Sequence, residues 1–438
     1  MVFSLDVRRA RKGDCMLLHY GPPDTPGLVM IDGGPRGVYG PHLKPRLKEI
    51  REARGIADND PLPVDVLMVS HVDDDHIQGI LDLTKELLEA KRAQRPQSVQ
   101  VLSLWHNSFD EIIDGETEEL TASVSAQFGP ASVSGGGELS DDERAEVEEE
   151  SDEDAEVVSS SLKVLASIKQ GFQLRVDAEG LGFERNLEFG GHLIVADKGQ
   201  SAVDMGRALT FTVAGPLKPE LEALRKKHNE WLKELEKEGK SPPQALAAYV
   251  DKSVPNLSSL VLLAESEGKS MLLTGDARGD KILEGLALVG LLKKGKTLNV
   301  DLLKVPHHGS ANNLEQAFFE RIIAKHYVFS GDGEHGNPER EALEMLLGAR
   351  GEDADYTIHL TYPVEEIDVE RKADWDEARK REKKRREKNP NAKVRKTWKR
   401  AVNSLGALFE AHPKLADKVK FVDADEPHVI DLGDPLGF

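Results

Sequence analysis

The stretch that most constrains this chain is Ser70–His76, which reads Ser-His-Val-Asp-Asp-Asp-His. It packs two imidazoles and three carboxylates into six residues, directly after the apolar run 64–69. That run is short and rich in β-branched residues, which predicts a buried strand. The polar cluster therefore follows the carboxyl end of a strand, where sheet enzymes commonly place their chemistry.

Two interpretations of this cluster are open. Neighbouring carboxylates repel one another, and the repulsion raises their pKa values unless a divalent cation neutralises them. A bound metal would therefore stabilise the arrangement. The alternative is a solvated turn that caps a following helix, because aspartate is favoured at helix starts. We expect the metal site.

Carboxylates and imidazoles also follow three later apolar runs, at 270–274, 300–305 and 327–329: these are Asp276, the pair His307 and His308, and His335. Strands of one sheet can bring their carboxyl ends to one edge, so these side chains can meet. Imidazoles and carboxylates without thiolates favour zinc, manganese or iron. Two such ions would supply a hydroxide nucleophile at neutral pH, and this predicts hydrolysis.

Composition limits the class of protein. The 438 residues are 39% hydrophobic and carry a net charge of −20, which disfavours general binding to polyanions but allows a local basic site. A single cysteine, Cys15, excludes an intrachain disulfide and a cysteine-based zinc site. The amino terminus lacks a signal-peptide pattern, and no run of 18 apolar residues occurs. We expect a cytoplasmic protein with no membrane contact.

The order of apolar runs predicts an α/β fold. Strands are expected within 1–34, helices at about 41–54 and 77–93, and a hairpin over 258–274. The segment 135–157 holds twelve acidic residues against one arginine, so we expect a disordered acidic insertion.

From about residue 366 we expect an appended, basic and helical extension, 366–438, that ends in a strand. Its core, 370–400, has fifteen Lys or Arg against six acidic residues. Trp375 and Trp398 interleave aromatic with basic groups, as a nucleic-acid binder would need. The alternative is a solvated helical pair whose tryptophans pack on the main domain, 1–365.

The motif His71-x-Asp73-x-Asp75-His76, with Gly79 soon after, resembles the signature of the metallo-β-lactamase fold. The usual form has a histidine where Asp73 stands; the aspartate variant is characteristic of the hydrolase domain of the DNA-uptake channel protein ComEC and its soluble relatives. Four further blocks agree in order over roughly residues 1–345: Gly13-Asp14-Cys15 leading to Ile31–Gly34, Asn256–Leu262, Leu272–Asp276 and Leu303–Ser310.

The resemblance implies an αββα sandwich with two divalent metal ions, zinc or manganese. It implies that His71 and Asp73 hold one ion, that Asp75, His76 and His308 hold the other, and that Asp276 bridges them. His307 is not separable from His308 by sequence. His106 is the best candidate for a further ligand, with His192 weaker and a core histidine equally open. Asp32 would be structural, and Asp75 and His335 would be the catalytic side chains, with a simple loop histidine as the open alternative for His335.

Among substrates, the resemblance favours the phosphodiester bonds of DNA, gripped by the Arg379–Arg400 region. A protein partner in a bacterial defence system is also implied. Two alternatives stay open. One is a hydrolase of a small phosphodiester or other ester, which the acidic charge favours. The other is a partner-binding protein with a vestigial site.

Overall fold

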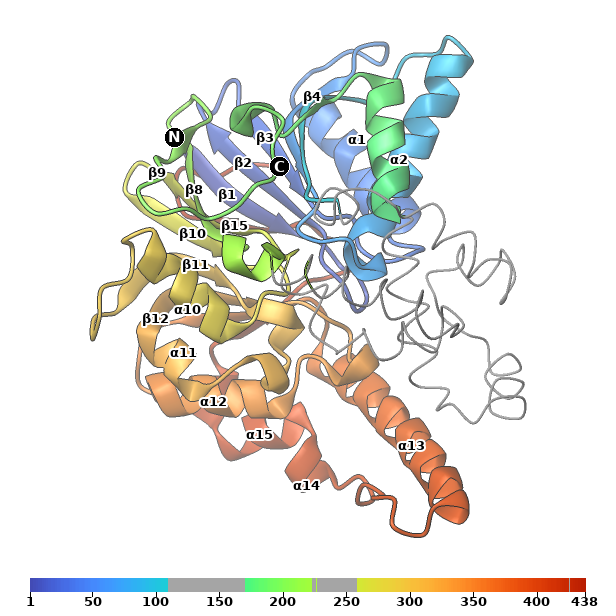
Figure 1. The fold of residues 1–438 in the computed structure, drawn as a ribbon, viewed down its shortest axis with the longest axis vertical. Helices are drawn as coiled ribbons and strands as arrows, with labels where there is room; N and C mark the ends of the chain where they lie inside the picture. Colours follow the sequence, from blue (N-terminus) through green and yellow to red (C-terminus); the bar gives the residue numbers. More distant parts are fainter. Residues whose placement is uncertain (109–169, 223–225, 227–257, 425) are drawn as a thin grey trace.

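The computed structural model describes residues 1–108, 170–222, 226, 258–424 and 426–438. These form a mixed α/β structure in which two mixed sheets pack face to face and helices cover their outer faces (Figure 1). The expected acidic insertion, 135–157, lies outside the described residues. None of the helices in the described part is long and apolar enough to cross a membrane.

The first sheet has seven strands. In spatial order they are β15 (His428–Asp431), β1 (Val2–Val7), β2 (Met16–Gly21), β3 (Gly27–Ile31), β4 (Leu62–Met68), β5 (Val99–Trp105) and β6 (Glu184–Arg185). β15, β1, β2 and β3 pair antiparallel, whereas β3 to β6 run parallel. The carboxyl ends of β3 and β4 therefore lie side by side.

The second sheet has eight strands. In spatial order they are β14 (Val419–Phe421), β13 (Thr357–Leu360), β12 (Ile322–Phe329), β11 (Leu298–Lys304), β10 (Lys269–Leu273), β9 (Val261–Ser266), β8 (Thr210–Gly215) and β7 (Val203–Asp204). Strands β10 to β14 are parallel, and β7 to β10 are antiparallel. The expected hairpin is the β9–β10 pair.

Apolar alternation along the strands divides the core into layers. Odd- and even-numbered residues of β2 and β3 point to opposite faces, so Leu18 and Ile31 enter the layer between the sheets while Leu17 and Met30 face the outer helices. The outer helices of the first sheet are α1 (Lys44–Ala53), α2 (Asp74–Arg92) and residues 170–181. Those of the second sheet are α10 (Gly279–Leu288), α11 (Gln316–Arg321), α12 (Arg340–Arg350), α15 (Leu405–Ala411) and α16 (Pro413–Ala416).

Two expected boundaries differ in the structure. The helix expected at 41–54 begins with a wide turn at Tyr39–Leu43 before α1. Helix α2 begins at Asp74 and not at residue 77, so Asp74 and Asp75 lie in its first turn, where acidic residues interact favourably with the helix dipole.

The segment after residue 366 is helical at its start, where α13 spans Val364–Lys388, and α14 (Arg400–Asn403) follows the return of the chain. α13 runs downward at the lower right of the molecule (Figure 1). The last two strands, β14 and β15, then join the second and the first sheet respectively. This segment therefore contributes to both sheets.

Candidate metal centre

The candidate site lies where loops from both sheets meet. Asp32 follows β3 and the 70–76 segment follows β4, whereas Asp276 and His308 follow the parallel strands β10 and β11. The two sets of loops are in contact, because a Cβ atom on Gly275, in the loop after β10, would lie 3.1 Å from the Cβ atom of Ser70. The site is thus built at the carboxyl ends of parallel strands in both sheets.

Glycines allow the polar loops to approach closely. A Cβ atom on Gly79 of α2 would lie 1.9 Å from the carbonyl oxygen of Gly33, so the helix can rest directly on the turn after β3. A Cβ atom on Gly13 would lie 1.8 Å from the carbonyl oxygen of Asp75. These contacts hold the first turn of α2 against the loop that carries Asp14.

The helix-capping alternative can be examined at Asp73. This residue occupies the N-cap position of α2, yet its side chain forms no capping hydrogen bond. Its Oδ2 atom lies 3.6 Å from His71 Nε2, and that nitrogen lies 3.8 Å from Asp276 Oδ2. The Asp73 carboxylate therefore faces the histidine and not the helix.

Four side chains surround a second position. His308 Nε2 lies 3.3 Å from Asp276 Oδ2 and 3.4 Å from Asp75 Oδ2. His76 Nε2 lies 3.4 Å from Asp276 Oδ1 and 3.8 Å from Asp75 Oδ2. A tetrahedral ion with bonds of about 2.0–2.1 Å needs ligand atoms about 3.3–3.4 Å apart. Three of these four distances meet that requirement, and the fourth, between His76 and Asp75, is longer at 3.8 Å.

Four of the atoms that face this space are buried without hydrogen-bond partners: His71 Nε2, His76 Nε2, His308 Nε2 and Asp276 Oδ1. Buried polar atoms are normally satisfied, so a group of unsatisfied ones that face each other needs an explanation. The ligand atoms of His71, Asp75 and His76 lie within 4.8 Å of one another, as do those of Asp14, His76, Asp276 and His308. The donor set fits a divalent transition-metal ion.

Hydrogen bonds behind the histidines aim their Nε2 atoms at this space. Asp32 Oδ2 lies 2.8 Å from His76 Nδ1, and both carboxylate oxygens of Asp32 accept hydrogen bonds from Ser70. On the other side His308 Nδ1 lies 2.8 Å from Ser330 Oγ, which donates to Asp14 Oδ1 at 2.5 Å. Such outer partners fix ring orientation in metal sites.

Two charged residues of the site were not assigned a role from sequence. Asp14 and Lys304 are both fully buried, and Lys304 Nζ lies 2.5 Å from Asp14 Oδ2. A lysine inside the otherwise apolar segment 302–305 is the signal that could have indicated a buried charge.

The electrostatics of the site favour positive charge. Burial opposes the charged form of His308, but the carboxylates of Asp276 and Asp14 raise its pKa to about 10. Burial likewise opposes ionisation of Asp276, yet His308 and His76 hold the pKa of that carboxyl well below its usual value. The protein therefore keeps its central carboxylate ionised.

The remaining candidate histidines occupy different positions. His307 Nε2 lies 3.8 Å from Asp276 Oδ2, and its side chain is 28% exposed against 2% for His308. His106 lies at the end of β5, where its N–H donates to Asn186 Oδ1, and it is not among the residues whose ligand atoms meet. His335 Nε2 lies 3.3 Å from Lys12 Nζ.

Backbone strain occurs at several residues of the candidate site. Asp32, His307, His308 and His335 have φ angles of 57°, 48°, 54° and 59°, a region that non-glycine residues seldom adopt. Strained backbone of this kind clusters at functional sites. His335 shares the feature with residues of the metal centre.

The tryptophans of the basic segment contact each other. The rings of Trp375 and Trp398 meet edge to face at 5.7 Å, and Trp375 Nε1 donates to Lys396 O. Arg395 lies over Trp375 and Arg371 over Trp398. The pair thus connects residues 389–399 to α13, and each ring has an arginine over one of its faces.

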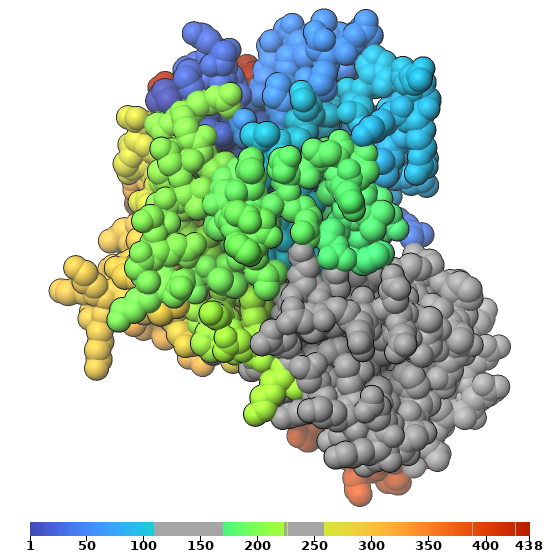
Figure 2. Space-filling view, turned by 45° about the horizontal axis from the view of Figure 1, so that its top comes forward, coloured from blue at the N-terminus to red at the C-terminus, as the bar shows by residue number. Residues whose placement is uncertain are grey.

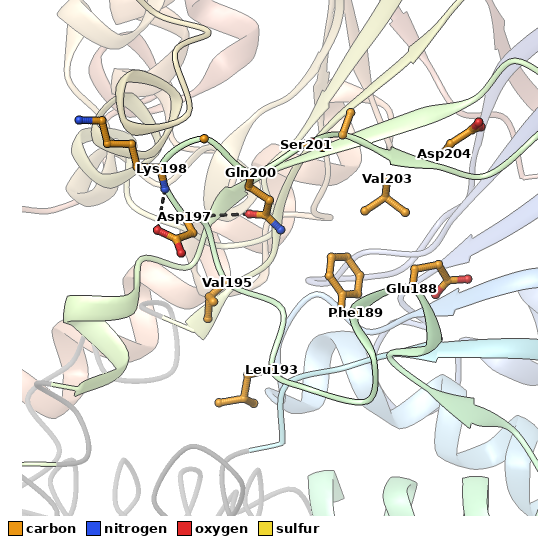
Figure 3. Close-up of a pocket in the computed structure, with 12 residues that line it drawn as sticks. Glu188, Phe189, Leu193, Val195, Asp197, Lys198, Gln200, Ser201, Val203 and Asp204 are labelled. Atoms are coloured by element: carbon orange, nitrogen blue, oxygen red, sulfur yellow. Dashed lines mark hydrogen bonds between the residues drawn. The ribbon is translucent and has the colours of Figure 1, made fainter.

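A cavity of about 820 Å³ lies elsewhere, beside β7 and the 188–204 segment (Figure 3). Phe189, Leu193 and Val203 line it together with acidic residues, and none of the candidate metal ligands does. Residues 170–222 cover this side of the molecule (Figure 2, green). The cavity is therefore separate from the candidate centre.

No protein-family model matches the chain. Part of the chain is similar to microtubule-associated protein 1A of Rattus norvegicus, 31% identical over 131 residues, which is 29% of this chain and 5% of that protein. Microtubule-associated protein futsch of Drosophila melanogaster is 36% identical over 78 residues, 18% of this chain and 1% of that protein. The chain thus spans 5% or less of these relatives' length, and the matches do not define a family.

Proposed function

We propose that this protein is a metal-dependent hydrolase with a metallo-β-lactamase-like αββα sandwich. One observation carries the proposal: buried ligand atoms without hydrogen-bond partners converge from three loops, after β4, β10 and β11. Those of His71, His76 and His308 are imidazole nitrogens that face Asp276. The distances of 3.4 and 3.3 Å from His76 and His308 to Asp276, which suit tetrahedral coordination, support it.

Two divalent ions, zinc or manganese, would be held in the arrangement that the resemblance implies. His71 with Asp73 would bind one, Asp75, His76 and His308 the other, and Asp276 would lie between them. When bound, such ions lower the pKa of coordinated water and stabilise negative charge on a phosphoryl oxygen.

The residues around the ligands have separate tasks. Asp32 and Ser330 orient His76 and His308 through their Nδ1 atoms, which would leave the Nε2 lone pairs available to the ions. His335, held beside Lys12 in a strained turn, is the side chain that would contact the phosphate or protonate the leaving group. Lys12 is adjacent to Gly13, which rests on Asp75.

We propose the phosphodiester bonds of DNA as the substrate. The loop that carries His335 packs on the first turns of α13, where Arg371 Nε donates to Gly336 O at 2.9 Å. The basic helix therefore starts beside the proposed centre. Its exposed cations include Arg381, Lys383 and Arg386. Because arginines occupy the tryptophan faces, this grip would act through phosphate charge and not through base stacking.

A second candidate is hydrolysis of a small phosphodiester, which the net charge of −20 favours. A partner-binding protein with a vestigial site is a third candidate. A bacterial defence partner and the partial similarity to microtubule-associated proteins are both compatible with this role. The intact ligand geometry speaks against decay of the site.

The proposal is tested by incubating the metal-free protein with Mn²⁺ or Zn²⁺ and with plasmid, single-stranded DNA, RNA or a chromogenic phosphodiester. We expect DNA cleavage that needs the ion, and we expect Asp276→Asn to lower it at least about 100-fold, because a ligand is lost. Asp301→Asn, which removes a β11 carboxylate that faces Lys325, is the matched control. Cleavage by D276N at the parental rate would refute the proposed site, and cleavage of the small ester alone would favour the second candidate.

A further inference from the structure

Lys304 places a positive charge inside the molecule. It is the last residue of β11 and has no exposed surface. Its ammonium contacts Asp14 Oδ2 at 2.5 Å, donates to Gly275 O at 3.2 Å and lies 3.8 Å from Asp276 Oδ1. A lysine is almost never fully buried unless it is paired, so this position has a specific requirement for charge.

Asp14 lies behind the two histidines that flank the centre. Its Oδ2 is 3.8 Å from His76 Nδ1, and its Oδ1 is 3.5 Å from His308 Nδ1. Ligand atoms of Asp14, His76, Asp276 and His308 lie within 4.8 Å of one another, which is a spacing suited to a cation. The ammonium of Lys304 already contacts one of these carboxylates and lies close to the other.

We propose that Lys304 is a built-in cation of the metal centre, a positioning residue that keeps Asp14 away from the metal ions and limits the negative charge that they meet. The inference rests on the proposed function, because it assumes that divalent ions bind at Asp276. Lys304 also holds the carbonyl oxygen of Gly275, the residue before Asp276, and so helps to position the central carboxylate.

An electrostatic role and a purely structural role of the Asp14–Lys304 pair predict different metal affinities for its variants. Lys304→Met keeps an unbranched side chain but leaves one more negative charge in the centre, so affinity for divalent ions should rise. Asp14→Asn keeps the shape but removes the nearest counter-ion of Lys304, so affinity should fall. If the pair only supported the fold, both variants would weaken binding. The double variant D14N/K304M restores the net charge and should bind within a few-fold of the parent.

The experiment titrates Mn²⁺ into the metal-free full-length chain by calorimetry or chelator competition. We expect at least about a tenfold increase in Mn²⁺ affinity for K304M and at least about a tenfold decrease for D14N. In a buried site, a unit charge a few ångströms from the bound ion changes the binding free energy strongly. Weakening in both single variants, or no change in either, would overturn the inference while leaving the metal centre in place.

Thermal unfolding of the metal-free variants provides a second measurement. K304M should unfold at a lower temperature than the parent, because Asp14 loses its counter-ion, and Mn²⁺ should raise its unfolding temperature more than it raises that of the parent. A smaller rise than in the parent contradicts the inference. A parent chain that binds no divalent ion at all would instead refute the proposed function, and with it this role of Lys304.

Discussion

Asp32 shows how a residue outside the proposed ligand set controls the geometry of the centre. Its backbone is left-handed, with φ of 57°, and this turn points both carboxylate oxygens back at Ser70. The same carboxylate meets His76 Nδ1 at 2.8 Å, which holds the ring proton on the far side from the ion space. A negative acceptor at this position therefore decides which His76 nitrogen is available to a metal.

We predict that Asp32→Asn will lower Mn²⁺ or Zn²⁺ affinity by about 10- to 100-fold, because the amide cannot accept all three hydrogen bonds. Asparagine tolerates the left-handed backbone, so the fold should be retained. Competition with a chromogenic chelator measures the change. Asp65→Asn, which removes an acceptor for Tyr20 in the same sheet, is the control. Equal affinity in D32N and the parent would argue against this orienting role.

Helix α13 is the element that best distinguishes DNA from a small phosphodiester as the substrate. Its first turns support the His335 loop, and its later turns expose a row of cations that the Trp375–Trp398 contact stiffens. Deletion from residue 366 would remove β14 and β15 from the two sheets, so it would test folding and not the grip. Removing charge while keeping the helix is the cleaner test.

We predict that the triple variant Arg381→Gln, Lys383→Gln and Arg386→Gln will weaken DNA binding and flatten its salt dependence. Each phosphate contact contributes about 0.9 to the slope of log K against log salt, so loss of three contacts should reduce it by up to about 2.7. Fluorescence anisotropy across salt concentrations measures the slope. Cleavage of a small chromogenic ester should stay at the parental rate. An unchanged slope would mean that α13 only packs against the domain.

At the scale of the whole molecule, a ladder of three histidines joins the sheets. His326 Nδ1 lies 3.0 Å from His359 Nε2, and His359 Nδ1 lies 2.8 Å from His428 Nε2. These residues belong to β12, β13 and β15, so the ladder runs from the second sheet to the first. Burial, followed by repulsion from His428 and His326, lowers the pKa of His359 to about 2. The charged neighbours of the ladder are Lys420, Lys325, Arg8, Asp6, Asp301 and Asp355.

We predict that this ladder makes the fold sensitive to mild acid. His359 stays neutral when folded, whereas an unfolded histidine takes up a proton near pH 6.5, so stability is lost as the pH falls from about 6.5 towards 2. The free energy of unfolding should drop by up to about 1.4 kcal/mol per pH unit for this group. Urea unfolding between pH 5 and 6.5 should show a shallower dependence in His359→Gln than in the parent or in exposed His192→Gln. Identical pH slopes would exclude the ladder as the cause.

Several features of this protein follow from local sequence. The apolar runs before Ser70, Asp276 and Pro306 are strands, because short β-branched or aliphatic segments bury well in a sheet. The position of polar residues just after each run also placed candidate ligands at strand ends. The ends of helices were less predictable than the helices themselves. Helix α2 begins at Asp74 because acidic residues are favourable in the first turn of a helix, and the spacing of apolar residues carries no information about this preference.

Local sequence thus determined the residue types of the candidate site and the strands that carry them, because both depend on neighbouring residues. Tertiary structure decided which of them meet: His308 lies deeper than His307, and His106 stays outside the cluster. It also brought Asp14 and Lys304, 290 positions apart, to 2.5 Å. Such pairings depend on how two sheets pack face to face, and residues distant in the chain reach one another only after that packing has formed.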